Sequence, residues 1–546
     1  MEKDINELWV IEAPGKVKTI KNILTDLQIN SCVMATKGHF ISMPDKLDPI
    51  GVDSVYNEYE RKPKDIKQIK RLRELAIRSK LIVVATDADQ EGDVIAWDIY
   101  TMVEDIQNNV IRVRLKGMDQ DSVLEAIRES KPVKKEDAIP GRTRSLIDRL
   151  IGATLSGNGI AVGRVGTSLL GLIQERKPTT QYLNLIAMDK KGGHPWKAVT
   201  PIISPLTQQI AKSLSELIFP SLSKETQSQV IFKPSHMGDI MVRASERLGM
   251  SPGETAKAMQ KSYEAGKLSY PRSGSNGVSI VVAQKIKKIL EKNRSGYKFD
   301  DTMVQKKDED EVHDSPYPIG DVNYSYDPEK QSADEGIRTL ISQDLIKTGQ
   351  KHIRQIPNTK VIEEFLIKKG FGIKVATFIS NLNWYKDEGP RFPGQQNWGN
   401  SEIVTRPADA VLLEEAMKAG LGKPSTWGNH IDGFMKRGLV DENLELTEKG
   451  KEWVLKSPKA LLNFKVSASI EKACEYKINK IEEGKEPWEI LASEIIKRLP
   501  VEISKPIMDE IQKNGIQPKI DFRKEADELE INNDVTDENI VKIDIN

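Results

Sequence analysis

The chain has 546 residues, enough for roughly three or four domains of ordinary size. Its 81 basic residues balance 81 acidic ones, but the last 26 residues carry nine acids and three bases, so residues 1–520 hold 78 basic against 72 acidic residues. No apolar run approaches the ~20 residues that cross a bilayer, and the N-terminus lacks a signal-peptide core, so a membrane or secreted protein is excluded. Two distant cysteines, Cys32 and Cys474, exclude zinc ribbons and disulfide frameworks.

Short apolar runs alternate with amphipathic stretches over the first 130 residues. Residues 8–11 and 81–85 predict strands buried on both faces, and 66–80 predicts a helix between them. This alternation is typical of a parallel α/β sheet, in which ligands bind beyond the carboxyl ends of the strands. Both strands end in acid, since Glu12 follows the first and Asp-Ala-Asp-Gln-Glu-Gly (87–92) follows the second.

The chain beyond residue 130 has several distinct patterns. Residues 138–178 are predicted to be helical and are rich in glycine and arginine, and 179–235 to be irregular or β-rich. Two helix-turn-helix patterns follow. The first, 237–264, has a capping box at 251–254 and a strand after it over 267–270; the second, 411–436, is followed by a β-like wing over 438–450. Such patterns bind nucleic acid in some proteins and are plain helical hairpins in others. The acidic segment from about 505 predicts a mobile tail.

The acidic loop is the first candidate site. Asp87, Asp89 and Glu91 place three carboxylates at alternating positions directly after a buried strand, where like charges crowd unless a cation joins them. Carboxylate oxygens without imidazole or thiolate suit Mg²⁺. The same letters match the start of a calcium-binding EF-hand with Asp98 at its twelfth position, but an EF-hand needs a helix before the loop. A solvated acidic turn is the other alternative.

Glu12 forms the second half of this candidate site. It leaves the first strand into Ala-Pro-Gly-Lys, and Lys16 begins a helix whose N-terminal N–H groups favour phosphate. An acid and a base therefore face one crevice. A structural role for Glu12 at the helix entry is the alternative to catalysis, and the neighbouring acidic strand end favours catalysis.

These two strand ends resemble the Toprim domain shared by topoisomerases, bacterial primases and some nucleases. The segment 266–273, Gly-Lys-Leu-Ser-Tyr-Pro-Arg-Ser, is similar to the one that presents the nucleophilic tyrosine of type IA DNA topoisomerases. Four more segments resemble the same family in the same chain order: 36–44, 148–152 with 163–167, 313–318 and 420–427. The sequence departs from the family pattern at Gln90, where an arginine is usual, at Asp93, at Tyr317 and over 273–275.

The resemblance implies an isomerase that cuts and rejoins single DNA strands, relaxing negatively supercoiled DNA through a 5′-phosphotyrosyl intermediate. This implied reaction needs no ATP, and no phosphate-binding GxxxxGK[ST] loop occurs in the sequence. The implied catalytic residues are Tyr270, Glu12, Lys16, Arg272 and His313. The implied ligands of Mg²⁺ are Asp87, Asp89, Glu91 and Glu12. The implied DNA-binding residues are Arg142, Arg149, Arg164, Thr167, Lys423, Ser425 and Thr426.

The expected fold is multidomain α/β plus α+β, with a β-rich arch closing a torus. The expected parts are a Toprim domain (1–137), a helical, winged-helix-like strand-binding domain (138–196 and 370–505), an arch (197–236 and 325–369), a tyrosine-bearing domain (237–324) and the acidic tail (506–546). We expect a monomer without membrane or nucleotide partners, in the cytoplasm with the nucleoid or inside a host cell. The rivals are another Toprim enzyme, a nuclease or primase, and a non-catalytic DNA-binding protein that keeps the fold.

Overall fold

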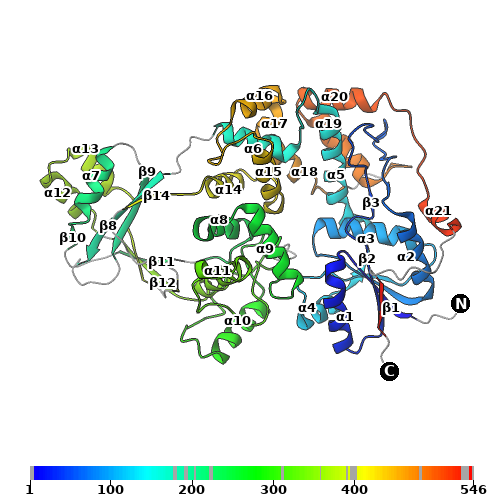
Figure 1. Ribbon diagram of the computed structural model, residues 1–546, viewed down its shortest axis with the longest axis horizontal. Helices are drawn as coiled ribbons and strands as arrows, with labels where there is room; N and C mark the ends of the chain where they lie inside the picture. Colours follow the sequence, from blue (N-terminus) through cyan, green and yellow to red (C-terminus); the bar gives the residue numbers. More distant parts are fainter. Residues whose placement is uncertain are drawn as a thin grey trace.

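The computed structural model describes most of the chain and places its parts along one long axis (Figure 1). The described residues are 5–175, 181–189, 195–201, 205–219, 226–230, 232–308, 313–356, 358–388, 392–393, 402–478, 482–529 and 540–543. Within these ranges no helix is both long and apolar enough to cross a membrane.

The N-terminal part is built on a six-stranded sheet in the order β15-β2-β1-β5-β6-β7. β2, β1, β5 and β6 are parallel, and the edge strands β15 and β7 are antiparallel. The chain goes from β1 to β2 on one side and later to β5 on the other, which is a topological switch, and the strand ends there form a natural ligand crevice. The strands are β1 (Ile5–Ile11), β2 (Ser31–Ala35), β5 (Ser79–Ala85), β6 (Val110–Arg112), β7 (Lys131–Pro132) and β15 (Ile540–Ile543).

Helices cover both faces of this sheet because its central strands are apolar on both sides. Leu8 and Val10 pack with α2 and α3, whereas Trp9 and Ile11 pack with α1 and α4. The expected parallel α/β sheet and the helix over 66–80 are thus confirmed. The elements are η1 (Pro14–Lys16), α1 (Val17–Asp26), α2 (Ile66–Arg78), α3 (Gln90–Val103) and α4 (Gln120–Arg128), with a small hairpin of β3 (Ile41–Ser42) and β4 (Lys62–Pro63).

Two helical groups adjoin the sheet. One surrounds the long helix α5, which packs on α19 and α20, and the other joins α6, α14 and α15 to α8 and α9. The first group comprises α5 (Lys135–Leu155), α17 (Lys459–Leu462), α18 (Phe464–Ala473), α19 (Pro487–Arg498) and α20 (Val501–Ile511). The second comprises α6 (Arg164–Glu175), α8 (Met237–Leu248), α9 (Pro252–Glu264), α11 (Ala333–Thr348), α14 (Ala408–Lys418), α15 (Pro424–Lys436) and α16 (Glu448–Lys456), and it is joined by α10 (Ile280–Lys292) and η2 (Pro328–Lys330).

A β-rich unit lies at the end of the molecule farthest from the N-terminal sheet (Figure 1). Its sheets are β10-β8-β14, with β9 also on β8, and β11-β12-β13. It comprises β8 (Gln181–Asp189), β9 (Trp196–Pro201), α7 (Pro205–Leu214), β10 (Ile218–Phe219), β11 (Thr226–Val230), β12 (His352–Ile356), α12 (Lys360–Lys368), α13 (Ile373–Ser380), β13 (Lys386–Glu388) and β14 (Glu402–Thr405). The described parts of 181–189 and 370–405, expected in the helical domain, lie in this unit, because Leu183 shares one core with Trp196, Ile379 and Trp384. The closed torus stays a prediction.

Two local predictions differ from the structure. The segment 267–270 is not a strand: only Leu268 pairs, in an isolated bridge with Pro318. The wing after α15 is likewise reduced to one bridge, between Val440 and Leu446. The capping box at 251–254 is confirmed, with Ser251 and Glu254 bonding each other's backbone N–H groups at the start of α9.

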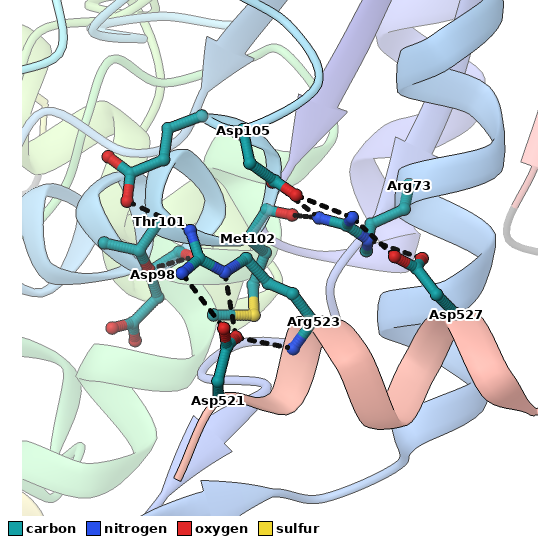
Figure 2. A network of polar contacts seen from close by, with 9 residues as sticks. Arg73, Asp98, Thr101, Met102, Asp105, Asp521, Arg523 and Asp527 are labelled. Carbon is teal, nitrogen blue, oxygen red and sulfur yellow. Dashed lines mark hydrogen bonds and ion pairs between the residues drawn. The ribbon is translucent and has the colours of Figure 1, made fainter. Parts of the chain in front are cut away.

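Two described segments near the end of the chain lie against the N-terminal part, in contrast to the expected mobile tail. α21 (Phe522–Glu528) packs on α2, and β15 adds an antiparallel strand to the edge of β2. Figure 2 shows buried Arg73 between two acids: its guanidinium binds Asp105 at 2.8 Å and Asp527 of α21 at 2.7 Å. The same guanidinium donates to the Met102 carbonyl at 2.7 Å. These charge-assisted bonds hold the C-terminal segment to the sheet.

This contact predicts a stability effect. Asp527→Asn is expected to lower the free energy of unfolding by about 1 kcal/mol, which is less than the roughly 1.5–3 kcal/mol of a bond to a charged group, because Asp527 is half exposed although Arg73 is buried. Urea denaturation of the full chain measures the change. Glu525→Gln on the same helix, an exposed residue, is the matched control and is expected to change stability by less than about 0.5 kcal/mol. Equal effects of the two substitutions would contradict the role of the Arg73 bond.

Candidate active site at the domain junction

The acidic loop is shaped by the turn from β5 into α3. Asp89 caps α3 and accepts a 2.7 Å hydrogen bond from the Gly92 N–H. A Cβ on Gly92 would lie 2.0 Å from the Asp87 carbonyl oxygen, so only glycine fits there. Buried Arg112 donates to the carbonyl of Asp87 at 2.7 Å and to that of Thr86 at 3.0 Å. The loop backbone is therefore fixed from both sides.

Lys16 lies inside the crevice rather than on its surface. Its side chain is buried and forms an ion pair with Asp87 Oδ1. Glu12 leaves β1 beside this pair, as the sequence predicts. Burial, together with the charges of Asp87 and Asp89, raises the pKa of Glu12 to about 7, against the lowering influence of Lys16 and Arg272. Glu12 thus changes charge near neutral pH, as a proton-transfer group requires.

Tyr270 crosses from the tyrosine-bearing part to this loop. Its hydroxyl donates a hydrogen bond to Asp89 Oδ2, and its backbone N–H donates to the Lys116 carbonyl at 2.9 Å. The turn before it needs Gly266, whose φ of 69° is left-handed and whose missing Cβ would lie 2.9 Å from the Met118 carbonyl oxygen. Tyr270 therefore meets the acidic loop, although some 180 residues separate them in the chain.

The environment of Tyr270 keeps its phenol protonated. The side chain is 1% exposed, and burial, followed by the charges of Asp89 and Asp87, raises its pKa well above the usual value. Burial alone raises the pKa of Asp89, but the bonds from Tyr270 and Gly92 N–H and the charge of Arg272 lower it overall. The site therefore holds a neutral phenol against an ionised carboxylate, beside the guanidinium of Arg272.

His313 lies against the ring of Tyr270. The two rings stack with centroids 4.3 Å apart, and burial lowers the pKa of His313 to about 4. The imidazole is therefore neutral at physiological pH. His313 thus contacts the residue predicted as the nucleophile. A histidine that was merely exposed after an acidic stretch would not make this contact.

The donor set suits a hard cation, although the four predicted ligands do not meet at one point. Glu91 lies against His39 at 2.8 Å, and within the described ranges no three His, Cys, Asp or Glu side chains are placed to hold one metal ion. Mg²⁺ needs no such cage, because it binds through one or two carboxylates, keeping water and substrate phosphate as its other ligands. Asp87 and Asp89 meet that requirement. Glu91 and Glu12 as further ligands stay predictions.

Four of the predicted DNA-binding residues are buried and have hydrogen-bond or ion-pair partners within the protein. Arg142 is buried, pairs with Glu58 and lies 4.7 Å over the Trp488 ring. Arg149 is buried and donates to the carbonyls of Pro44, Pro49 and Ile50 at 2.7–2.9 Å, and Arg164 pairs with Asp148 at 2.9 Å and Glu471 at 2.7 Å. Thr167 is buried and accepts a bond from Gly163 N–H at 3.2 Å. These partners lie within the protein and account for the burial of the four side chains, and DNA binding by these residues stays a prediction.

A cavity of about 630 Å³ opens between the acidic loop and α15. Asp89, Arg272, His313 and Lys423 are among its lining residues. Lys423 Nζ donates to Gln90 Oε1 at 3.1 Å, so Gln90, the departure from the family loop, links the loop to the start of α15. Ser425 and exposed Thr426 follow in the first turn of α15. These three residues stay candidates for binding DNA phosphates.

Two residues of the site escaped the sequence reasoning. Tyr263, at the end of α9, donates to Asp87 Oδ1 at 3.1 Å, and nothing in the helical pattern distinguishes it from a core aromatic residue. Arg112 could have been noticed in the sequence, because a charged residue within an apolar strand is costly unless it is paired.

Comparison with known proteins agrees with this geometry. The DNA topoisomerase family matches residues 134–493, and the Toprim domain matches residues 7–117. DNA topoisomerase 1 of Aquifex aeolicus is 23% identical over 541 residues, covering 90% of this chain and 98% of that protein. DNA topoisomerase 1 of Buchnera aphidicola is 25% identical, covering 90% of this chain and 65% of that protein.

A solved structure extends the comparison to the fold. The full-length topoisomerase I of Thermotoga maritima superposes with a TM-score of 0.60 at 17% identity, covering 90% of this chain and 89% of that one. This likeness concerns the fold alone. Because the matched family extends over more than half of the residues, the chain belongs to the DNA topoisomerase family and has a type IA core.

Proposed function

We propose that the protein relaxes negatively supercoiled DNA by cutting and rejoining single strands, with Tyr270 as the nucleophile. The Tyr270 hydroxyl gives its proton to Asp89, its hydrogen-bond partner, as its oxygen bonds to a backbone phosphorus. The bond from that phosphorus to the 3′ oxygen breaks, and the 3′ oxygen takes up a proton from Glu12. Another strand passes through the gap before the 3′ hydroxyl attacks the phosphotyrosine. One phosphoester replaces another, so the step needs no ATP.

The observation that carries this proposal is the contact between Tyr270 and the acidic loop. Its hydroxyl bonds to Asp89 across a junction between two parts of the chain, although 181 residues separate them in sequence. A tyrosine that served only for packing would not need to reach a carboxylate beside Lys16 and Arg272. Nucleases and primases with this loop do not need a tyrosine there.

The surrounding side chains stabilise the developing charge, transfer the proton and hold the Tyr270 ring. Arg272 and Lys16 offset negative charge that develops on the phosphoryl oxygens, an effect worth about 3–4 kcal/mol for a preorganised donor. Glu12, with its pKa near 7, gives a proton to the leaving 3′ oxygen and takes it back during rejoining. His313 stacks on Tyr270 and keeps the ring in place.

A divalent cation completes the site. Asp87 and Asp89 would hold Mg²⁺, which supplies positive charge to the phosphate and positions the cut end for rejoining. Lys423, Ser425 and Thr426 would bind phosphates of the single strand on the opposite wall of the cavity. The active unit is a monomer, because both halves of the site belong to one chain.

A relaxation assay tests the proposal. Negatively supercoiled plasmid is incubated with the full chain, with and without Mg²⁺ and without ATP, and denaturant is then added to trap covalent complexes. We expect Mg²⁺-dependent relaxation and protein attached to the 5′ end of the cut strand. Cleavage without attached protein would identify a nuclease instead. Binding of single-stranded DNA with neither cleavage nor relaxation would identify a non-catalytic protein.

A further inference from the structure

A second tyrosine reaches the acidic loop beside Tyr270. Tyr263 is the penultimate residue of α9 and is fully buried, with 0% exposure. Its hydroxyl donates to Asp87 Oδ1 at 3.1 Å, so its bond crosses the same junction as that of Tyr270. The two phenols therefore bond to different carboxylates of the loop: Tyr270 bonds to Asp89, and Tyr263 bonds to Asp87.

Tyr263 also contacts the partners of both carboxylates. Lys16 Nζ, which pairs with the same oxygen of Asp87, lies 4.8 Å from the Tyr263 ring centroid, within range of a cation–π interaction. The Tyr263 ring meets that of Tyr270 edge to face, with centroids 5.6 Å apart. One buried side chain thus touches the carboxylate, its counter-ion and the nucleophile.

The two donors to Asp87 act on one oxygen. A carboxylate held at Oδ1 by an ammonium and a phenol cannot rotate freely about its Cβ–Cγ bond. Lys16 comes from the helix that follows β1, and Tyr263 comes from the other side of the junction. Asp87 therefore has both Oδ1 donors only while the two parts are together, and it keeps Lys16 alone when they separate.

We propose that Tyr263 is a positioning residue that orients Asp87 for Mg²⁺ and couples this orientation to closure of the junction. The inference rests on the proposed function, since it assigns Asp87 to the cation. The residues of the acidic loop do not by themselves provide this link across the junction. The Tyr263 hydroxyl does not touch the phosphate or take part in proton transfer, so its loss is expected to weaken the cation site and not to remove the nucleophile.

The test compares two buried tyrosines with hydroxyl groups that cross the junction. Tyr263→Phe keeps the ring and removes the bond to Asp87. Tyr317→Phe is the matched control, because the Tyr317 hydroxyl bonds to Ser122 of the N-terminal part and not to a carboxylate of the site. Thermal unfolding of each full-length protein is recorded against Mg²⁺ concentration without DNA, which reports cation binding independently of activity.

We expect Tyr263→Phe to raise the Mg²⁺ concentration at half effect by about 10- to 100-fold, as is usual when a partner of a metal ligand is removed. Tyr317→Phe is expected to shift it less than about twofold, because it leaves the ligands untouched. Covalent capture of DNA by Tyr263→Phe is expected to recover at saturating Mg²⁺. An unchanged Mg²⁺ midpoint in Tyr263→Phe, or an equal shift in both variants, would overturn the proposal.

A double-mutant cycle provides a second measurement. If Tyr263 acts through Asp87, adding Tyr263→Phe to Asp87→Asn changes the Mg²⁺ midpoint no further than Asp87→Asn alone, whereas additive effects contradict the role. Failure of this inference is distinguishable from failure of the proposed function. If the wild-type protein never captures DNA, the proposed function is wrong. If the wild type captures DNA normally and Tyr263→Phe has the same Mg²⁺ midpoint as the wild type, only the inference about Tyr263 is wrong.

Discussion

Tyr270→Phe is expected to abolish both covalent DNA capture and plasmid relaxation while leaving single-strand binding within about twofold of wild type. In the proposed reaction the phenol oxygen bonds to phosphorus, so no residual route exists once it is gone. The ring remains and keeps its stack on His313, at a centroid distance of 4.3 Å in the wild type, so the junction retains its packing. Capture on a 5′-labelled and a 3′-labelled oligonucleotide measures the first effect, and fluorescence anisotropy measures binding.

The neighbouring tyrosines make this experiment selective. Tyr317→Phe, also buried, is expected to capture DNA like the wild type. Tyr263 is the only other phenol that contacts the acidic loop among the described residues, and it lies edge-on to Tyr270. Should Tyr270→Phe still trap DNA while Tyr263→Phe fails even at saturating Mg²⁺, the nucleophile would be Tyr263 and the assignment of Tyr270 would be wrong.

The parallel sheet and its loops were predictable because their signals are local. The double-sided apolar runs at 8–11 and 81–85 specify buried strands, and acids directly after them must lie at the same edge of the sheet. The helices over 237–248 and 252–264 were also predictable, with a capping box marking the boundary between them. Tyr270 was singled out by resemblance alone, since local propensity carries no information about its contact with a residue 181 positions away.

The arginines show what sequence reasoning leaves open. Arg142 and Arg164 occur where acids are sparse nearby in sequence, which favours an anionic ligand, but Glu58 and Glu471 reach them from distant segments. A charge that lacks a local partner is therefore ambiguous until the fold is known. The C-terminal segment fails for the same reason: its acidic composition predicts disorder, but Asp527 has a buried partner in Arg73.

Glu12 is expected to govern how both stability and activity depend on pH. Its pKa is about 7 in the folded protein and about 4.5 in an ordinary setting, so the folded state prefers the protonated form. The stability contributed by this preference is complete below about pH 4.5 and is lost as the pH rises through 7. In metal-free buffer Glu12→Gln is therefore expected to be more stable than wild type at pH 8, by up to about 3 kcal/mol, and equal to it near pH 4.

The same titration predicts an effect on the reaction. A group that gives a proton to the leaving 3′ oxygen must be protonated, so single-turnover cleavage by the wild type is expected to fall as pH rises above about 7. Glu12→Gln cannot donate this proton, so its cleavage is expected to be slower by about 10²–10⁴-fold and to lack this decline, while DNA binding changes little. Thermal unfolding and quenched-flow cleavage between pH 4 and 9 measure the two effects. A stability difference that is constant across this range would show that Glu12 does not titrate as its burial beside Asp87 requires, and a Glu12→Gln profile that keeps the wild-type decline would assign the proton to another group.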